Sequence, residues 1–392
     1  MTTFPRNDTL KTIFDVLCIR LWIYNPNPWR DFAGDWDFLM CGVERNLRDL
    51  IHNRIKCLIA LGGALAVLVV GVAVGSVYIS PGDIINIIGH QFFNMPLEAE
   101  PTAVAIVMSL RLPRTLLAFI AGAALSVSGA VMQSVLRNPL ASSYTIGISS
   151  GASLGAAVVI LLGVTIPFAG PFSLPLVGFV SGLATILFAL SFAARIDGQM
   201  ENHTVILVGM VFSLFVNAIT TVMMAMSHEQ MQRLIFWQMG SFSMRDWQAV
   251  YILAPVAVIG TLIIAHYHRE LDMMTFGEES AKAMGVNLKQ VKWALLVVSA
   301  ALTGSVIAFV GVIGFVDLVA PHVVRKLFRS DHRWVVPMSA LTGGTFMVVC
   351  DLIARTIVSP RELPVGAVTA MVGAPFFAYV YLGGRRKRRA NA

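Results

Sequence analysis

The sequence predicts an all-α polytopic membrane protein with about ten transmembrane helices. Of its 392 residues, 56% are hydrophobic and 13% are charged, and the mean hydropathy is +0.74. Soluble domains are about 45–50% apolar and about 25% charged. Long apolar runs recur from residue 57 almost to the C-terminus. This pattern excludes an ordinary soluble enzyme, a disordered chain and a nucleic-acid-binding module, because most of the surface must face something other than water.

Residues 1–56 differ from the rest and are predicted to form an N-terminal cytoplasmic or interfacial extension before a transmembrane domain at 57–392. They are mixed in charge and lack an apolar run of about 20 residues. Within them, residues 12–24 fit a short helix lying in the membrane interface or a loosely ordered tail equally well.

Ten apolar runs are predicted to be membrane segments, because they are long and contain few charged residues. The eighth is too short to span alone and carries Pro321, so we expect a broken or partial helix there. The segments are 57–79, 103–134, 144–163, 172–194, 204–226, 248–266, 293–315, 317–328, 336–354 and 365–382.

Lysine and arginine predict the orientation of these segments. A basic run at 385–389 directly follows the last segment, and Arg54 and Lys56 precede the first. Both termini are therefore expected in the cytoplasm. The basic residues Arg325, Lys326, Arg329 and Arg333 then also lie inside.

Small residues recur at four-residue spacing, as in Gly122, Ser126 and Ala130. Such stripes let helices approach closely in lipid. They indicate either a dimer face or packing within one bundle, and packing is favoured.

A cytoplasmic stretch at 271–286 lies between two long spans and is predicted to form two short helices broken near Gly277 and Gly285. We expect Met273, Met274, Phe276 and Met284 to be exposed there, and an exposed apolar patch usually marks a partner surface. A loop folded back on the bundle is the alternative, but it would leave Glu278 and Glu279 without a purpose.

Several motifs, in order, give the chain a family resemblance. It resembles the permease subunit of type II ABC importers, the family of vitamin B12, haem and ferric-siderophore permeases. The motifs are Arg111-Leu-Pro-Arg114, Gly129-Ala-Val-Met-Gln-Ser134, Arg137-Asn-Pro-Leu140, Gly147-Ile-Ser-Ser-Gly-Ala152, Phe236-Trp-Gln-Met-Gly-Ser241, Gly277-Glu-Glu-Ser-Ala281, Ala320-Pro-His-Val-Val-Arg325, Asp331-His-Arg333 and Glu362-Leu-Pro-Val-Gly-Ala367. Asp317 departs from the pattern, since the family usually has a small residue there.

The resemblance implies the type II permease fold, paired as a homodimer or with a related permease in the inner membrane of a prokaryote. Two ATPase subunits would bind the cytoplasmic face, and a substrate-binding protein would dock outside. The chain would be a transport subunit and no enzyme. It has no G-x-x-x-x-G-K-[ST] loop, so ATP and Mg²⁺ would be held by the ATPase and this chain would carry no cofactor. The coupling helices would lie at about 271–290, with Phe276, Gly277, Glu278, Glu279, Ala281 and Gly285 as the coupling residues.

Arginines on the predicted outer side are exceptions to the rule that basic residues favour the cytoplasmic side, so we expect them to have a function such as docking. Arginine binds carboxylates with two parallel hydrogen bonds, so Arg111, Arg114 and Arg355 are predicted to hold the binding protein. The alternative for Arg355 is a pair with Asp351, four residues earlier on the same helix.

The fifth segment is the predicted wall of the translocation path, because methionines suit bulky ligands. The side chains expected to line the path are Met210, Ser213, Asn217, Thr220 and Met224. We expect no metal site, since His322 and the pair His266 and His268 fit structural roles better.

The expected cargo is a metal chelate: a ferric siderophore, haem or cobalamin. An oxyanion such as molybdate remains an alternative cargo. The alternative class is an ion-coupled secondary transporter, which has no need of the loop at 271–286.

Overall fold

The computed structural model describes residues 53–75, 77, 79–96, 99–167, 169–198, 200–328 and 330–390. Of residues 92, 228 and 379–390 only the backbone is described. The predicted interfacial helix at 12–24, nearly all of the N-terminal extension and Arg329 lie outside these residues, as do the side chains of the basic run at 385–389. The chain divides into two units, Met1–Ile59 and Ala60–Ala392. Of the first, the described residues 53–59 are helical.

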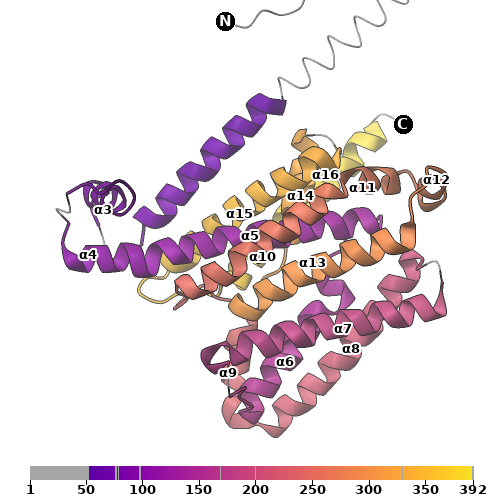
Figure 1. The fold of residues 1–392 in the computed structure, drawn as a ribbon, viewed down its shortest axis with the longest axis horizontal. Coiled ribbons are helices and arrows are strands. Elements are labelled where there is room, and N and C mark those ends of the chain that lie inside the picture. The colour runs from indigo at the N-terminus through magenta and orange to yellow at the C-terminus, as the bar shows by residue number, and fades with distance from the viewer. Residues whose placement is uncertain are drawn as a thin grey trace, which may run out of the picture. The chain divides into compact units, whose positions relative to one another are not determined.

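Every regular element in the described part of the chain is a helix (Figure 1). Among the described residues, seven helices or joined helices are long and apolar enough to cross a membrane. They are Asn53–Ala73, Pro101–Val135, Gly170–Ile196, Asn202–Met226, Trp247–His266, Leu288–Val310 and His332–Thr356. The chain is therefore an all-α polytopic membrane protein, as predicted.

The second of these spans is built from three pieces that join end to end. They are α4 (Pro101–Ala105), a π-helical turn (Ile106–Arg111) and α5 (Leu112–Val135). The other long helices are α7 (Ser173–Ile196), α8 (Asn202–Met226), α10 (Trp247–His266), α13 (Leu288–Val310) and α15 (His332–Thr356).

Three further helices match the remaining predicted segments. They are α6 (Ile148–Leu162), α14 (Val316–Phe328) and α16 (Val365–Ala390). As predicted, α14 is short and contains Pro321.

Four further helices lie between the spans. They are α3 (Pro81–Phe93), α9 (His228–Gln238), α11 (His268–Thr275) and α12 (Glu278–Ala283). The predicted break of the cytoplasmic stretch near Gly277 and Gly285 is confirmed, since both glycines have positive φ angles, of 118° and 87°. Within the second unit, α11 and α12 lie at the opposite end of α5 from α3 and α4 (Figure 1).

The core forms around α5 and α13, the most buried spans. In the most apolar stretch of each, 78% and 72% of residues are buried, against 28% in α8. A Cβ on Gly122 of α5 would lie 2.3 Å from the carbonyl oxygen of Gly343 on α15. The small-residue stripe through Gly122 therefore packs inside this bundle, as favoured from the sequence. Among the spans that follow the first, whose most apolar stretch is 17% buried, α8 is the least buried.

Candidate functional site

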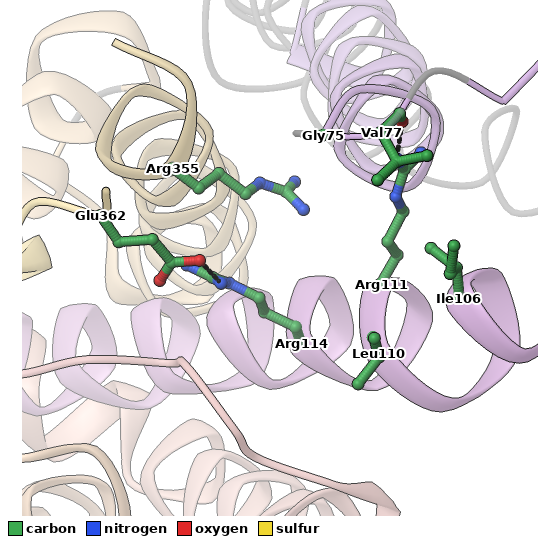
Figure 2. Close-up of a pocket in the computed structure, with 8 residues that line it drawn as sticks. All are labelled: Gly75, Val77, Ile106, Leu110, Arg111, Arg114, Arg355 and Glu362. Carbon is green, nitrogen blue, oxygen red and sulfur yellow. Dashed lines mark hydrogen bonds and ion pairs between the residues drawn. The ribbon is translucent and has the colours of Figure 1, made fainter. Parts of the chain in front are cut away.

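A cavity of about 340 Å³ brings the three predicted docking arginines together at the start of α5. Arg111 and Arg114 reach it from the second span, and Arg355 reaches it from the end of α15 (Figure 2). Glu362, on the connection between α15 and α16, lines the same cavity. The sequence alone does not predict that these side chains cluster, because they lie up to 251 positions apart along the chain.

Two of the arginines bind main-chain oxygens at the end of the first span. Arg111 donates to the carbonyl oxygens of Val72 (3.3 Å), Ala73 (2.7 Å) and Val77. Arg355 donates to the carbonyl oxygen of Gly71. The last carbonyls of a helix lack partners within it and carry partial negative charge, so a guanidinium group is well suited to cap them. Both side chains are buried, and their docking role stays a prediction.

The third arginine, Arg114, holds two carboxylates at once. Its Nε and Nη2 lie 3.0 and 2.8 Å from Oδ1 of Asp351, and its Nη1 lies 2.7 Å from Oε1 of Glu362. Asp351 is completely buried, whereas the Glu362 side chain is 34% exposed. The alternative named for Arg355, a pair with Asp351 on the same helix, is present, with Arg355 Nε 3.6 Å from Oδ2 of Asp351. That distance is too long for a hydrogen bond, so Arg114 is the main partner of Asp351.

At the other end of α5, α11 and α12 form the predicted coupling loop. Phe276 is 76% exposed and Met284 is 50% exposed. The expectation that Met274 is also exposed is wrong, because it packs with Leu271 into the main core. Ala281 is buried in the same core, and Met273 is partly buried against it. Phe276 and Met284 are therefore the large apolar side chains that the loop exposes.

The acidic residues of this loop differ in role. Glu278 Oε1 lies 2.9 Å from Nζ of Lys292, a side chain only 1% exposed in the first turns of α13. The same ammonium group donates to the carbonyl oxygen of Met200 at 2.7 Å. Glu278 thus neutralises a buried charge, which was missed from the sequence, while Glu279 is exposed. A polar cavity of about 480 Å³ beside Glu278 is lined also by Arg137 and His203.

The loop has a second polar contact, on α11. Oδ1 of Asp272 lies 2.6 Å from Nδ1 of His332 and accepts the main-chain N–H of the same residue at 2.9 Å. Burial raises the pKa of Asp272, but the hydrogen bonds from His332 outweigh it and leave the pKa below its usual value. The carboxylate is therefore ionised at neutral pH.

The predicted path residues share one face of α8, since they fall within a narrow arc at 100° per residue. Met210 and Asn217 are exposed, and Thr220 is buried. The hydroxyls of Ser213 and Thr220 donate to carbonyl oxygens of their own helix, as is common for hydroxyls in spans. Met224 is partly buried against α6 and α9. Their role in a path stays a prediction.

Comparison with known proteins gives a consistent picture. The profile of the FecCD transport family matches residues 63–383. The ABC transporter permease protein YvrB of Bacillus subtilis is 40% identical over 87% of this chain and 97% of its own length. The cobalamin import system permease protein BtuC of Halobacterium salinarum is 37% identical over 71% of this chain and 74% of its own length. The hemin transport system permease protein HmuU of Yersinia pestis is 37% identical over 72% of this chain and 84% of its own length.

A solved structure has the same fold. It is an inward-facing ABC transporter described as of the metal-chelate type, with a TM-score of 0.71, 27% identity, and coverage of 83% of this chain and 98% of that one.

Proposed function

The chain belongs to the FecCD transport family, and we propose that it is the permease subunit of an ATP-driven importer that moves a metal chelate across the cytoplasmic membrane. A ferric siderophore, haem or cobalamin is the proposed cargo. Relatives named for cobalamin, hemin and Fe(3+)-citrate support this class of cargo. The family is one of transport permeases, and in this proposal ATP and Mg²⁺ are held by a separate ATPase.

The observation that carries the ATPase proposal is the loop formed by α11 and α12. It exposes Phe276 and Met284 to solvent, while Glu278 and Asp272 hold it against buried basic side chains of α13 and α15. Exposed apolar side chains on a firmly held helical frame favour a docking surface for a protein. A secondary transporter has no use for such a surface.

The test of this surface is association with the ATPase. Phe276→Glu combined with Met284→Lys is expected to abolish co-purification of the ATPase, because both changes put charge into an apolar contact and leave Glu278 and Lys292 paired. Phe236→Glu is the matched control, since Phe236 is 69% exposed but lies on α9, on the predicted outer side. If the double variant retains the ATPase as well as the control does, the surface is assigned wrongly.

Docking of a substrate-binding protein is proposed for the arginine cavity. Three guanidinium groups meet there, with Asp351 and Glu362 as their carboxylate partners. A carboxylate of the docked protein would add to this positive site and compete with Glu362 for Arg114. Arg114 is the best placed for direct contact, because Arg111 and Arg355 hold the end of the first span.

A second permease copy is proposed to cover α8 and complete the path. The open sides of α8 carry large apolar residues, among them Leu207, Leu214 and Phe215. Both termini are proposed to be cytoplasmic, as the basic runs indicate. Two copies per complex are expected by native mass spectrometry, and a stable complex with one copy would contradict this.

A further inference from the structure

His332, in the Asp331-His-Arg333 motif, lies at a junction of four helices. It is the first residue of α15 and is 1% exposed. Its Nδ1 faces Asp272 of α11 at 2.6 Å, and its Nε2 faces the hydroxyl of Ser134 of α5 at 2.6 Å. Arg325 of α14 donates to the same hydroxyl at 2.8 Å. We name Asp272, His332, Ser134 and Arg325 the His332 network.

A histidine is needed for this geometry because its two ring nitrogens lie on opposite edges of a rigid ring. The carboxylate of Asp272 can only accept, so Nδ1 carries a proton. The other ring nitrogen meets a hydroxyl that can both accept and donate. One side chain thus joins the coupling loop to the last turns of α5 through hydrogen bonds at both ends.

The Ser–His–Asp order resembles a nucleophilic triad, but the surroundings of Ser134 do not suit one. Ser134 is 5% exposed, and its hydroxyl accepts from Arg325 while its single proton faces both Nε2 of His332 at 2.6 Å and the carbonyl oxygen of Ala130 at 2.9 Å. This hydroxyl is therefore engaged in holding helices together.

The network continues from Ser134 into the interior. Arg325 also donates to Oε1 of Gln133, and Nε2 of Gln133 donates to the carbonyl oxygen of Asp317 at 3.2 Å. Asp317 lies in the first turn of α14, where a Cβ on Gly129 of α5 would fall 1.9 Å from the same carbonyl oxygen. A shift of α11 is thereby connected, through contacts with little slack, to both ends of α14.

We propose that His332 is a positioning residue that passes movement of the coupling loop to α5 and α14. The inference rests on the proposed function, because the movement would come from the ATPase. In this account the Glu278–Lys292 pair holds α12 to α13, and the His332 network carries the displacement of α11 inward. Discrete hydrogen-bonded arrangements of packed helices are the kind of element that can carry such coupling.

The test uses the full chain assembled with its ATPase in nanodiscs. Met244, which is 98% exposed on the predicted outer side, is replaced by cysteine after the four native cysteines are removed. The rate of labelling by a membrane-impermeant maleimide is measured with and without ATP and vanadate. The otherwise unchanged complex is expected to show a change of about fivefold or more, which is the usual scale of allosteric coupling.

His332→Ala is expected to reduce this response to less than about twofold while the complex still assembles and hydrolyses ATP. Ser134→Ala removes the contact with Nε2 of His332 and leaves the helix intact, because alanine is the best helix former. If the His332→Ala complex fails to assemble, the response of Ser134→Ala tests the inference in its place. His322→Ala on α14 is the matched control, since His322 lies outside the network and contacts Phe377.

A merely structural role would lower the melting temperature and the yield of complex, and leave the response of each assembled complex unchanged. That result in both variants would overturn the inference. Absence of any response in the unchanged complex would instead contradict the proposed function.

Discussion

At the scale of single residues, Arg114 forms an ion pair with the buried carboxylate of Asp351. Asp351 is fully buried in α15 and accepts three hydrogen bonds from Arg114. Two of them go to Oδ1 and the third goes to Oδ2. An uncompensated buried carboxylate is costly, so the arginine is needed for folding before it can serve any partner. The structural role and the proposed docking role would therefore meet in one side chain.

Removing Arg114 is expected to destabilise the permease strongly. Arg114→Ala leaves Asp351 buried without its main partner, and breaking such a pair typically costs about 3–5 kcal/mol. Glu362→Gln changes the more exposed partner and is expected to cost about 0–1 kcal/mol. Thermal unfolding of the two purified variants makes the comparison, and equal melting temperatures would refute the ranking.

The same Glu362→Gln variant tests the docking proposal. If Glu362 competes with the partner's carboxylate for Arg114, its neutralisation should tighten binding of the substrate-binding protein and increase the dependence of binding on salt. Glu100→Gln, just before the start of α4, is the control for a general loss of negative charge on the predicted outer side. Unchanged affinity in Glu362→Gln, measured in nanodiscs at low salt, would remove Glu362 from the docking site.

At the scale of helices, close approach of glycines fixes how α5 and α15 pack. A Cβ on Gly122 would lie 2.3 Å from the Gly343 carbonyl oxygen, whereas nothing lies within 4 Å of a Cβ on Gly62 in the first span. Such main-chain contacts leave no room for a methyl group unless the helices separate.

Gly122→Ala is therefore expected to destabilise the bundle by about 1–3 kcal/mol through overpacking. Gly62→Ala, the matched control, is expected to be neutral or stabilising by up to about 1 kcal/mol, since alanine favours a helix. Unfolding in detergent measures both. A Gly122→Ala variant as stable as Gly62→Ala would show that α5 and α15 can separate freely.

Most helices, but not all of their ends, could be predicted from the sequence. The long spans follow from apolar length, but two predicted segments run past the ends of their helices. The first, predicted to end at 79, stops at Ala73. The segment predicted to end at 315 stops at Val310, because Gly311 has a φ of 79° that ends the helix within an apolar run. The short helices α3 and α9 were missed, since neither is a long apolar run.

The site was predictable in part and for a clear reason. Local pattern predicted the loop with Phe276 and singled out the arginines that the orientation rule places outside. The pairing of Arg114 with Asp351 joins residues 237 positions apart, and the burial of Lys292 depends on α12 lying over it. Such contacts depend on tertiary packing, which periodicity within one segment does not encode.

At the scale of the whole molecule, the two candidate surfaces lie at opposite ends of α5. The arginine cavity adjoins its start, and the loop with Phe276 and Met284 adjoins its last turns through Asp272, His332 and Ser134. A buried helix that adjoins both surfaces could pass a change at one surface to the other. This arrangement suits a protein whose cytoplasmic side must respond to an event on its outer side.

The central claim is that transport of a metal chelate by this permease is driven by ATP through a partner ATPase. The most direct measurement is uptake into proteoliposomes that hold the permease, its ATPase and its binding protein, with haem, cyanocobalamin and ferric citrate as separate probes. We predict that at least one probe accumulates only when ATP is supplied on the ATPase side, and that Phe276→Glu with Met284→Lys abolishes this accumulation. Accumulation driven by a proton or sodium gradient without ATP would contradict the account and make the chain a secondary transporter.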